Sequence, residues 1–307
     1  MKRWLATLPV AAAVALFGLA ARAAETSAMS FASPGSGERI PATLIKPDGA
    51  GPFPAIVIVH DCSGLGPSSS GAPTRWADDL VALGYVVIVP DSFSPRGVGA
   101  GVCTLPPQEA RVASGYVRAR DAYGALTALR TLPYVDGKRI GLIGGSHGGW
   151  TTLAAISAPQ SASEPLAAEK REGFAAAVAL YPNCAIRYGA WSTTRQSGDT
   201  GPMAEYSGVY KPIAPVLILI GEADDWTPAE PCRRLVEASR AAGFPMDIRA
   251  YPGAHHSFDS PNPVRFDPRR FNNSSPTGKG ATTGGNPEAW AAAKKEVASF
   301  FGQQLKK

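Results

Sequence analysis

Short apolar runs alternate along this chain with longer amphipathic segments. The runs are rich in Val, Ile, Leu and Ala, as in strands covered on both faces, and lie at residues 56–59, 85–89, 139–143, 174–180, 216–220 and 246–251. Segments with apolar positions at helical spacing lie at residues 74–83, 109–132, 148–158, 229–242 and 287–305. This alternation predicts an α/β fold with a mostly parallel sheet and helices on both faces.

Two stretches interrupt the rhythm. Residues 186–211 are polar and rich in Gly, Ser and Thr, and residues 259–286 are rich in Pro, Asn, Gly and Ser. We expect both to be loops that cap a substrate pocket, because long loops in compact domains are often functional. A disordered insertion is the alternative, above all for the second stretch.

The N-terminus has the features of a secretory signal peptide. Lys2 and Arg3 precede an apolar run over residues 4–20, and small residues stand at Ala21 and Ala23. We expect cleavage after about Ala23, which leaves residues 24–307 as a single domain in the periplasm or outside the cell. An uncleaved membrane anchor is the alternative, since the run is just at the spanning limit.

Charge and motif content exclude several functions. The formal net charge is +5, but three basic residues leave with the signal peptide, and basic residues form no cluster of five or more, so we expect no nucleic-acid partner. After cleavage no apolar run approaches membrane length, so we expect no stable membrane insertion. The chain shows no Gly-rich phosphate loop or dinucleotide fingerprint, which implies no cofactor.

Four cysteines remain in the mature chain: Cys62, Cys103, Cys184 and Cys232. Their even number in an oxidising compartment predicts two disulfides, with three connectivities open. Their wide spacing lacks the close pairs of a zinc site, and the four histidines lack a His-x-x-x-His arrangement. We therefore expect no metal.

A nucleophile motif follows the strand at residues 139–143. Residues 144–148 read Gly-Gly-Ser-His-Gly, the G-x-S-x-G pattern of a tight strand-to-helix turn that exposes a serine hydroxyl. The motif is weak alone, because a chain with 33 glycines produces such matches by chance. The preceding strand and the following helix make Ser146 the candidate nucleophile.

The order of the remaining parts strengthens this interpretation. In this fold an acid and then a histidine follow the serine, each on a loop after a strand. Asp224 follows the strand at 216–220, and His256 follows the strand at 246–251; Asp225 and His255 are the adjacent competitors. A neutral imidazole would take the proton of Ser146, and a carboxylate would orient the imidazole.

Ester chemistry also needs two backbone N–H donors for the oxyanion. The residue after the nucleophile, His147, supplies one. The other should come from the loop after the first buried strand, and Cys62 is the best candidate. The side chains of His60 and His147 are expected to be structural.

These residues resemble the dienelactone hydrolase family of α/β hydrolases. The resemblance spans about residue 40 to the C-terminal helix and rests on residues 60–65 (His-Asp-Cys-Ser-Gly-Leu), 91–93, 144–149, 221–228 and 251–258. It implies an α/β-hydrolase fold with a sheet of about eight strands, and an enzyme without cofactor that hydrolyses small esters or lactones. The family's acid stands four before a proline, here Asp224, and its histidine two before a phenylalanine, here His256.

The resemblance carries further implications. The namesake enzymes use cysteine at the nucleophile, where this chain has Ser146, so dienelactone itself is in doubt as the substrate. Asp61 is similar to a carboxylate that contacts the resting nucleophile, and Arg96 is a counterpart for arginines that bind the substrate. The fold implies the disulfides Cys62–Cys103 and Cys184–Cys232.

The sequence therefore predicts a periplasmic or secreted serine hydrolase that acts on small-molecule esters or lactones through Ser146, Asp224 and His256. Tyr188 and Trp191 lie in the first capping stretch, where aromatic rings suit either a substrate pocket or lid packing. A peptidase or acyltransferase would use the same triad. A non-catalytic binding protein on the same fold is the alternative from another class.

Overall fold

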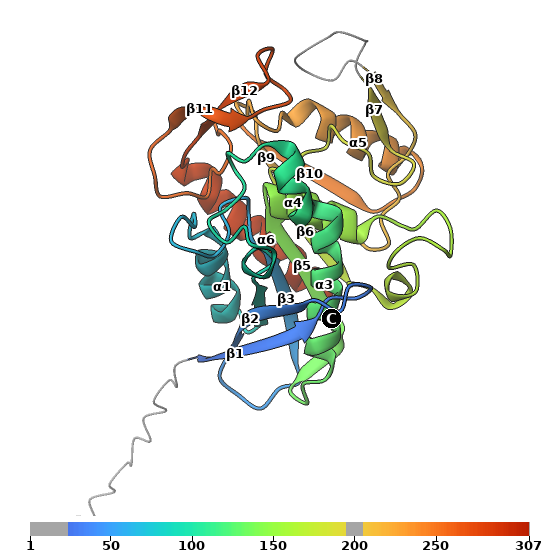
Figure 1. Cartoon of the computed structure of the whole chain (residues 1–307). Helices are drawn as coiled ribbons and strands as arrows, with labels where there is room; N and C mark the ends of the chain where they lie inside the picture. The colour runs from blue at the N-terminus through green and yellow to red at the C-terminus, as the bar shows by residue number, and fades with distance from the viewer. Residues whose placement is uncertain (1–23, 195–204, 307) are drawn as a thin grey trace, which may run out of the picture.

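The computed structural model describes residues 24–194 and 205–306 (Figure 1). The expected signal peptide, residues 1–23, lies outside the described residues, as does part of the first capping stretch.

An eight-stranded sheet forms the centre of the protein, in the order β1-β2-β4-β3-β5-β6-β9-β10. Its strands are β1 (Glu25–Ala32), β2 (Arg39–Lys46), β3 (Phe53–Val59), β4 (Val86–Pro90), β5 (Val135–Gly145), β6 (Ala176–Leu180), β9 (Val216–Gly221) and β10 (Met246–Tyr251). β2 pairs antiparallel with β1 and β4, and the other neighbours are parallel. The expected α/β-hydrolase sheet is confirmed, and the β1–β2 hairpin is added to the strands that the apolar runs predicted.

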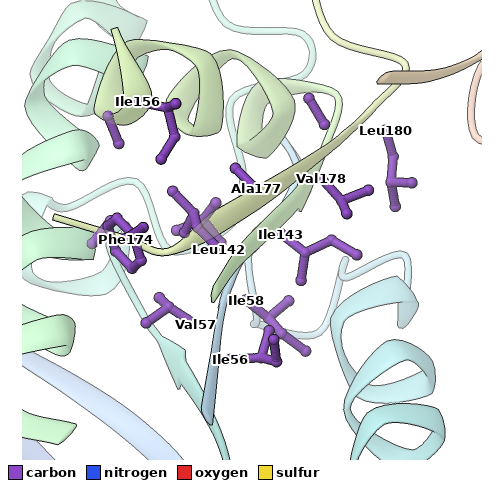
Figure 2. Packing of buried hydrophobic residues seen from close by; sticks show 14 of the residues in the cluster. Ile56, Val57, Ile58, Leu142, Ile143, Ile156, Phe174, Ala177, Val178 and Leu180 are labelled. Carbon is purple, nitrogen blue, oxygen red and sulfur yellow. The ribbon is translucent and has the colours of Figure 1, made fainter. Parts of the chain in front are cut away.

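Continuous apolar runs form the central strands because both faces of the sheet are covered. In Figure 2 the side chains of Val57 and Leu142 extend toward Ile156, whereas Ile56 and Ile143 extend to the opposite face. These four strand residues are at most 1% exposed. Alternate residues of one strand therefore supply two separate core layers.

Helices cover both faces of this sheet (Figure 1). α1 (Ala72–Ala82) and α6 (Pro287–Leu305) pack on one face, and α3 (Gly115–Arg130) and α4 (His147–Ile156) pack against each other on the opposite one. α5 (Ala229–Ala241) contacts β9 and β10. Two short 3-10 turns, η1 (Ser94–Arg96) and η3 (Glu169–Glu172), lie in the connections.

The helix expected over residues 109–132 is in fact broken. α2 (Pro107–Ala110) and the 3-10 turn η2 (Arg111–Ala113) end before Ser114, and α3 begins at Gly115. Ser114 takes an extended conformation, and its hydroxyl accepts a hydrogen bond from the backbone N–H of Val117 at 3.4 Å. A serine that caps the following turn competes with helix continuation, so the break has a local cause.

Both capping stretches contain hairpins that the sequence did not predict. β7 (Ser192–Thr194) pairs with β8 (Glu205–Ser207), and β11 (Arg265–Phe271) pairs with β12 (Lys279–Thr283). Asn272 in the second hairpin donates to the carbonyl of Asp225 at 2.9 Å, and Thr282 binds the Asp225 carboxylate. The β11–β12 hairpin is therefore bound to the loop that carries Asp224.

Candidate active site

Ser146 occupies a strained turn between β5 and α4. Its backbone has φ 56° and ψ −115°, a conformation that costs an L-residue about 1–3 kcal/mol. The backbone N–H of Ser146 donates to the carbonyl of Leu180 at 2.9 Å, which fixes the turn to β6. A Cβ on Gly148 would lie 2.1 Å from the carbonyl oxygen of Val59, so only glycine fits there. The sequence pattern thus places the Ser146 hydroxyl above the sheet edge.

The carboxyl ends of three parallel strands bring Ser146, Asp224 and His256 together. Ser146 Oγ lies 2.8 Å from His256 Nε2, and His256 Nδ1 lies 2.8 Å from Asp224 Oδ2. Because the carboxylate can only accept, Nδ1–H donates to Asp224 and Nε2 is left to accept the serine proton. The side chains of His256 and Asp224 are almost completely buried, so water does not compete for these contacts.

The Asp224 carboxylate is held by its own loop. Its Oδ1 accepts the backbone N–H groups of Trp226 at 3.0 Å and Thr227 at 2.8 Å, which directs Oδ2 to His256. The hydroxyl of Thr227 lies 3.0 Å from both Asp224 Oδ2 and His256 Nδ1. Sequence reasoning missed Thr227, although its position three residues after an aspartate is a signal for such a turn.

Asp225 and His255, the neighbours that compete with Asp224 and His256 for the catalytic roles, make other contacts. Asp225 accepts hydrogen bonds from the backbone N–H and the hydroxyl of Thr282, at 2.8 and 2.7 Å. His255 Nδ1–H donates to the carbonyl of Ala223 at 2.8 Å. Both side chains stabilise the loops, and neither is in the hydrogen-bonded chain that leads to Ser146.

Aromatic rings enclose His256. The rings of Tyr181 and Trp226 each lie 4.8 Å from the imidazole, and the guanidinium of Arg270 lies 4.6 Å from the Trp226 ring. Burial raises the pKa of Tyr181 well above its ordinary value, and the Asp259 carboxylate that accepts from its hydroxyl at 2.8 Å raises it further. Tyr181 is therefore a neutral wall of the site at working pH.

Cys62 and His147 line the same cleft as Ser146. His147 is the first residue of α4, and Cys62 stands in the loop after β3. The carbonyl of Cys62 accepts from Val102 N–H at 2.7 Å, and its sulfur is bonded to Cys103. The two residues expected to supply the oxyanion donors thus line the cleft, and a disulfide holds the loop that carries Cys62.

This cleft has a volume of about 290 Å³, at the lower limit for small-molecule sites. Its apolar walls come from separate parts of the chain: Val102, Leu105, Trp150, Ile186, Trp226 and Phe271. Among the described residues that line it, Arg111 is the one Lys, Arg, Asp or Glu. The arrangement suits an acyl group that is largely apolar.

Two expected pocket residues lie elsewhere and are corrected here. Arg96 donates to both carboxylate oxygens of Asp121, at 2.7 and 2.9 Å, and also pairs with Glu38. Its side chain is 6% exposed, so this guanidinium is bound within the protein and is not directed to substrate. The Asp61 carboxylate accepts from Ser63 and Ser70 and lines a neighbouring polar cleft, not the one that holds Ser146.

Tyr188 and Trp191, which were also expected as possible pocket residues, lie away from this cleft. Both are 1% exposed, and neither lines the cleft that holds Ser146. The Tyr188 hydroxyl donates to the carbonyl of Asn183 at 2.8 Å, and the Trp191 indole N–H donates to that of Cys184 at 3.0 Å. These aromatics fill the interior beneath the capping stretch, which is the lid-packing alternative.

The structure joins Cys62 to Cys103 and Cys184 to Cys232, the pairs that the family resemblance implied. Such bonds are typical of proteins outside the reducing cytosol. Within residues 24–194 and 205–306, no helix has the length and apolar content to span a bilayer. The same residues contain no group of three or more His, Cys, Asp and Glu side chains able to hold a metal ion.

Comparisons with known proteins agree with this architecture. A curated relative from Methylorubrum extorquens, named "Putative carboxymethylenebutenolidase", is 28% identical over 71% of this chain and 68% of its own. The crystal structure titled "Putative Dienelactone Hydrolase" from Klebsiella pneumoniae matches with a TM-score of 0.59 at 19% identity, covering 91% of this chain and 99% of its own.

A peptidase shares the fold. Dipeptidyl peptidase 4 of Porphyromonas gingivalis matches with a TM-score of 0.57 at 21% identity, over 92% of this chain but 36% of its own.

The family model described as the dienelactone hydrolase family matches residues 40–305. This chain belongs to the dienelactone hydrolase family.

Proposed function

We propose that the protein is a serine hydrolase that cleaves carboxylic esters or lactones through an acyl-enzyme. The observation that carries this proposal is the hydrogen-bonded chain from Ser146 Oγ through His256 to Asp224, at 2.8 Å for each contact. A serine in this arrangement can lose its proton to a neutral imidazole as it attacks a carbonyl carbon.

The proposed reaction has two halves. Ser146 Oγ bonds to the carbonyl carbon, its proton passes to His256 Nε2, and the N–H groups of Cys62 and His147 bind the oxyanion. The tetrahedral intermediate expels the alcohol, which takes the proton from His256 and leaves an acyl-serine. Water then attacks the acyl group, again with His256 as base, and releases the acid and free Ser146.

A serine nucleophile suits the proposed compartment. A reactive thiolate outside the cytosol is exposed to oxidation and disulfide exchange, whereas a hydroxyl is inert to both. We propose that the chain is exported with cleavage after about Ala23. N-terminal sequencing of the periplasmic protein tests this, and a mature protein that still begins at Met1 would contradict it.

The apolar cleft indicates the substrate class. Trp150, Trp226 and Phe271 line the cleft that holds Ser146, which favours esters with an apolar or aryl acyl group. The family's peptidase relatives raise amide cleavage as a second activity, so the substrate panel pairs each ester with the amide of the same acyl group. We expect the ester to be hydrolysed and the amide to react far more slowly.

Adjacent carboxylates supply a matched test. Asp224→Asn leaves the side-chain shape but removes the charge that orients His256, and in a comparable triad this change costs about 10⁴ in kcat. Asp225→Asn, one residue away, removes only a contact to Thr282. Ester hydrolysis lost in Asp224→Asn and largely kept in Asp225→Asn supports the proposal. Equal activity in both variants, or no hydrolysis by the wild type, contradicts it.

A further inference from the structure

We propose that Arg118 is a positioning residue that joins the two halves of the oxyanion hole and places a buried positive charge beneath it. The inference rests on the proposed function and adds to it a residue outside the triad and the oxyanion donors.

Arg118 contacts both loops that supply the donors. It lies in α3 and is fully buried. Its Nη2–H donates to the carbonyl of His60 at 2.7 Å, two residues before Cys62. Its Nη1–H donates to Nδ1 of His147 at 2.7 Å. The backbone N–H of His147 is the second proposed oxyanion donor. One rigid guanidinium thus fixes the loop after β3 relative to the start of α4.

The charge of Arg118 is not cancelled at contact distance. Among the described residues no carboxylate oxygen lies within 4.0 Å of its guanidinium nitrogens. Asp121, one turn further along α3, is already bound by Arg96 and by the Ser33 hydroxyl, at 2.7 Å each. Arg118 Nε is buried without a hydrogen-bond partner, and the ring of Phe93 lies 4.9 Å from the guanidinium.

The imidazoles of His60 and His147 beside Arg118 are both neutral, and Arg118 binds the ring of His147 but the backbone carbonyl of His60. Burial, and then the positive charge of Arg118, lower the pKa of His60 and of His147 well below the ordinary value. Burial also lowers the pKa of Arg118 to about 9, so it remains a cation at neutral pH. A buried cation bound to neutral groups is costly in a folded protein. The carboxylates of Asp121, Asp61 and Asp91 offset part of this charge from beyond contact distance, and little water screens the field that remains.

The buried charge of Arg118 would stabilise the transition state of the proposed reaction. Negative charge develops on the carbonyl oxygen only in the tetrahedral transition state, on the other side of the two donors that Arg118 holds. Interactions that strengthen only in the transition state raise kcat and leave substrate binding unchanged. Arg118 therefore acts on kcat, through the position of the donors and through its field, without touching substrate.

Arg130 provides a matched control on the same helix. Its guanidinium also donates to two backbone carbonyls, of Gly137 at 3.0 Å and Glu172 at 2.6 Å, but it is exposed and borders a different surface. Arg118→Met, Arg118→Lys and Arg130→Met are compared for kcat, KM and inhibition by a trifluoromethyl ketone carrying the substrate's acyl group. This ketone forms a tetrahedral adduct with an oxyanion.

We expect Arg118→Met to lower kcat at least thirtyfold with KM within threefold, and to weaken the ketone by the same factor as kcat/KM. Arg118→Lys keeps the charge and one of the two bonds, so it should fold and lose about tenfold in kcat. If Arg118→Met does not fold, the lysine variant alone decides. Arg130→Met should change kcat by less than threefold.

Folded Arg118 variants that match Arg130→Met in kcat and in ketone affinity would overturn the inference. If wild-type Ser146 still reacts with a fluorophosphonate, the proposed function stands in that case. A wild type that neither hydrolyses esters nor reacts with the fluorophosphonate would overturn both.

Discussion

Replacing both cysteines of one disulfide by serine should separate stability from activity. The Cys62–Cys103 bond spans 41 positions of the sequence and the Cys184–Cys232 bond spans 48. Loop-closure entropy then predicts that each bond stabilises the fold by about 4 kcal/mol. The second pair is the more buried, so its serines add the cost of buried hydroxyls, and we expect this variant to lose at least as much stability.

Activity should follow the opposite order. Cys62 carries one of the proposed oxyanion donors, and loss of such a donor costs about 10²–10³ in kcat. The loop keeps the bonds from Val102 and Arg118, so we expect a partial effect, at least tenfold, in the variant without Cys62–Cys103. The variant without Cys184–Cys232 should stay within threefold of the wild type while it is folded.

Urea denaturation and ester hydrolysis at 15 °C measure the two quantities on the same samples. The low temperature keeps both variants folded after a loss of about 4 kcal/mol, which is a large part of a typical total stability. The reasoning is refuted if the two folded variants lose activity equally, or if only the variant without Cys184–Cys232 loses it.

Three more substitutions test the site, and a fourth, in α6, is a control. Gly148→Ala should lower kcat at least tenfold, because its Cβ meets the carbonyl at the end of β3. Gly302→Ala has open space around its Cβ in α6 and should raise the free energy of unfolding by up to about 1 kcal/mol. Ester assays and thermal melts in which the two variants behave alike would count against this. Thr227→Val should lower kcat about three- to tenfold, which corresponds to the free energy of one hydrogen bond. Unchanged kinetics would show that the Thr227 hydroxyl does not contribute to catalysis. The pKa values of His60 and His147 are lowered in the folded protein, so below about pH 6.5 the unfolded chain binds protons that the folded chain does not. The free energy of unfolding should therefore decrease as the pH is lowered, by up to about 1.4 kcal/mol per pH unit for each histidine. Urea titrations at pH 7, 6 and 5 should give a shallower fall for folded His147→Gln, and parallel falls would contradict the assignment.

The sequence predicted the parts of the fold that local patterns determine. Strands covered on both faces need continuous apolar runs, so β3, β5 and β9 are visible in the chain without a structure. The loops after β5, β9 and β10 must meet at one edge of a parallel sheet. Order along the chain therefore indicated Ser146 and the two loops that carry the acid and the histidine. The family resemblance then selected Asp224 over Asp225 and His256 over His255.

Parts that depend on tertiary contacts escaped this reasoning. Arg118 is one of 30 basic residues, and its contacts with His60 and His147 join positions 58 and 29 residues apart. In the β11–β12 hairpin, β11 is mostly charged and largely exposed, and β12 is a short run of small and polar residues, so neither has the apolar alternation that would predict a strand. Arg96 was misplaced because its partner Asp121 lies on a different element of the fold.

The most direct test of the central claim, an activated serine at Ser146, is intact-mass analysis after reaction with a fluorophosphonate, followed by peptide mapping. The account predicts one adduct, on Ser146, which is absent in His256→Ala and kept in His255→Ala. The folded wild type without an adduct, or an adduct that survives in His256→Ala, would contradict it.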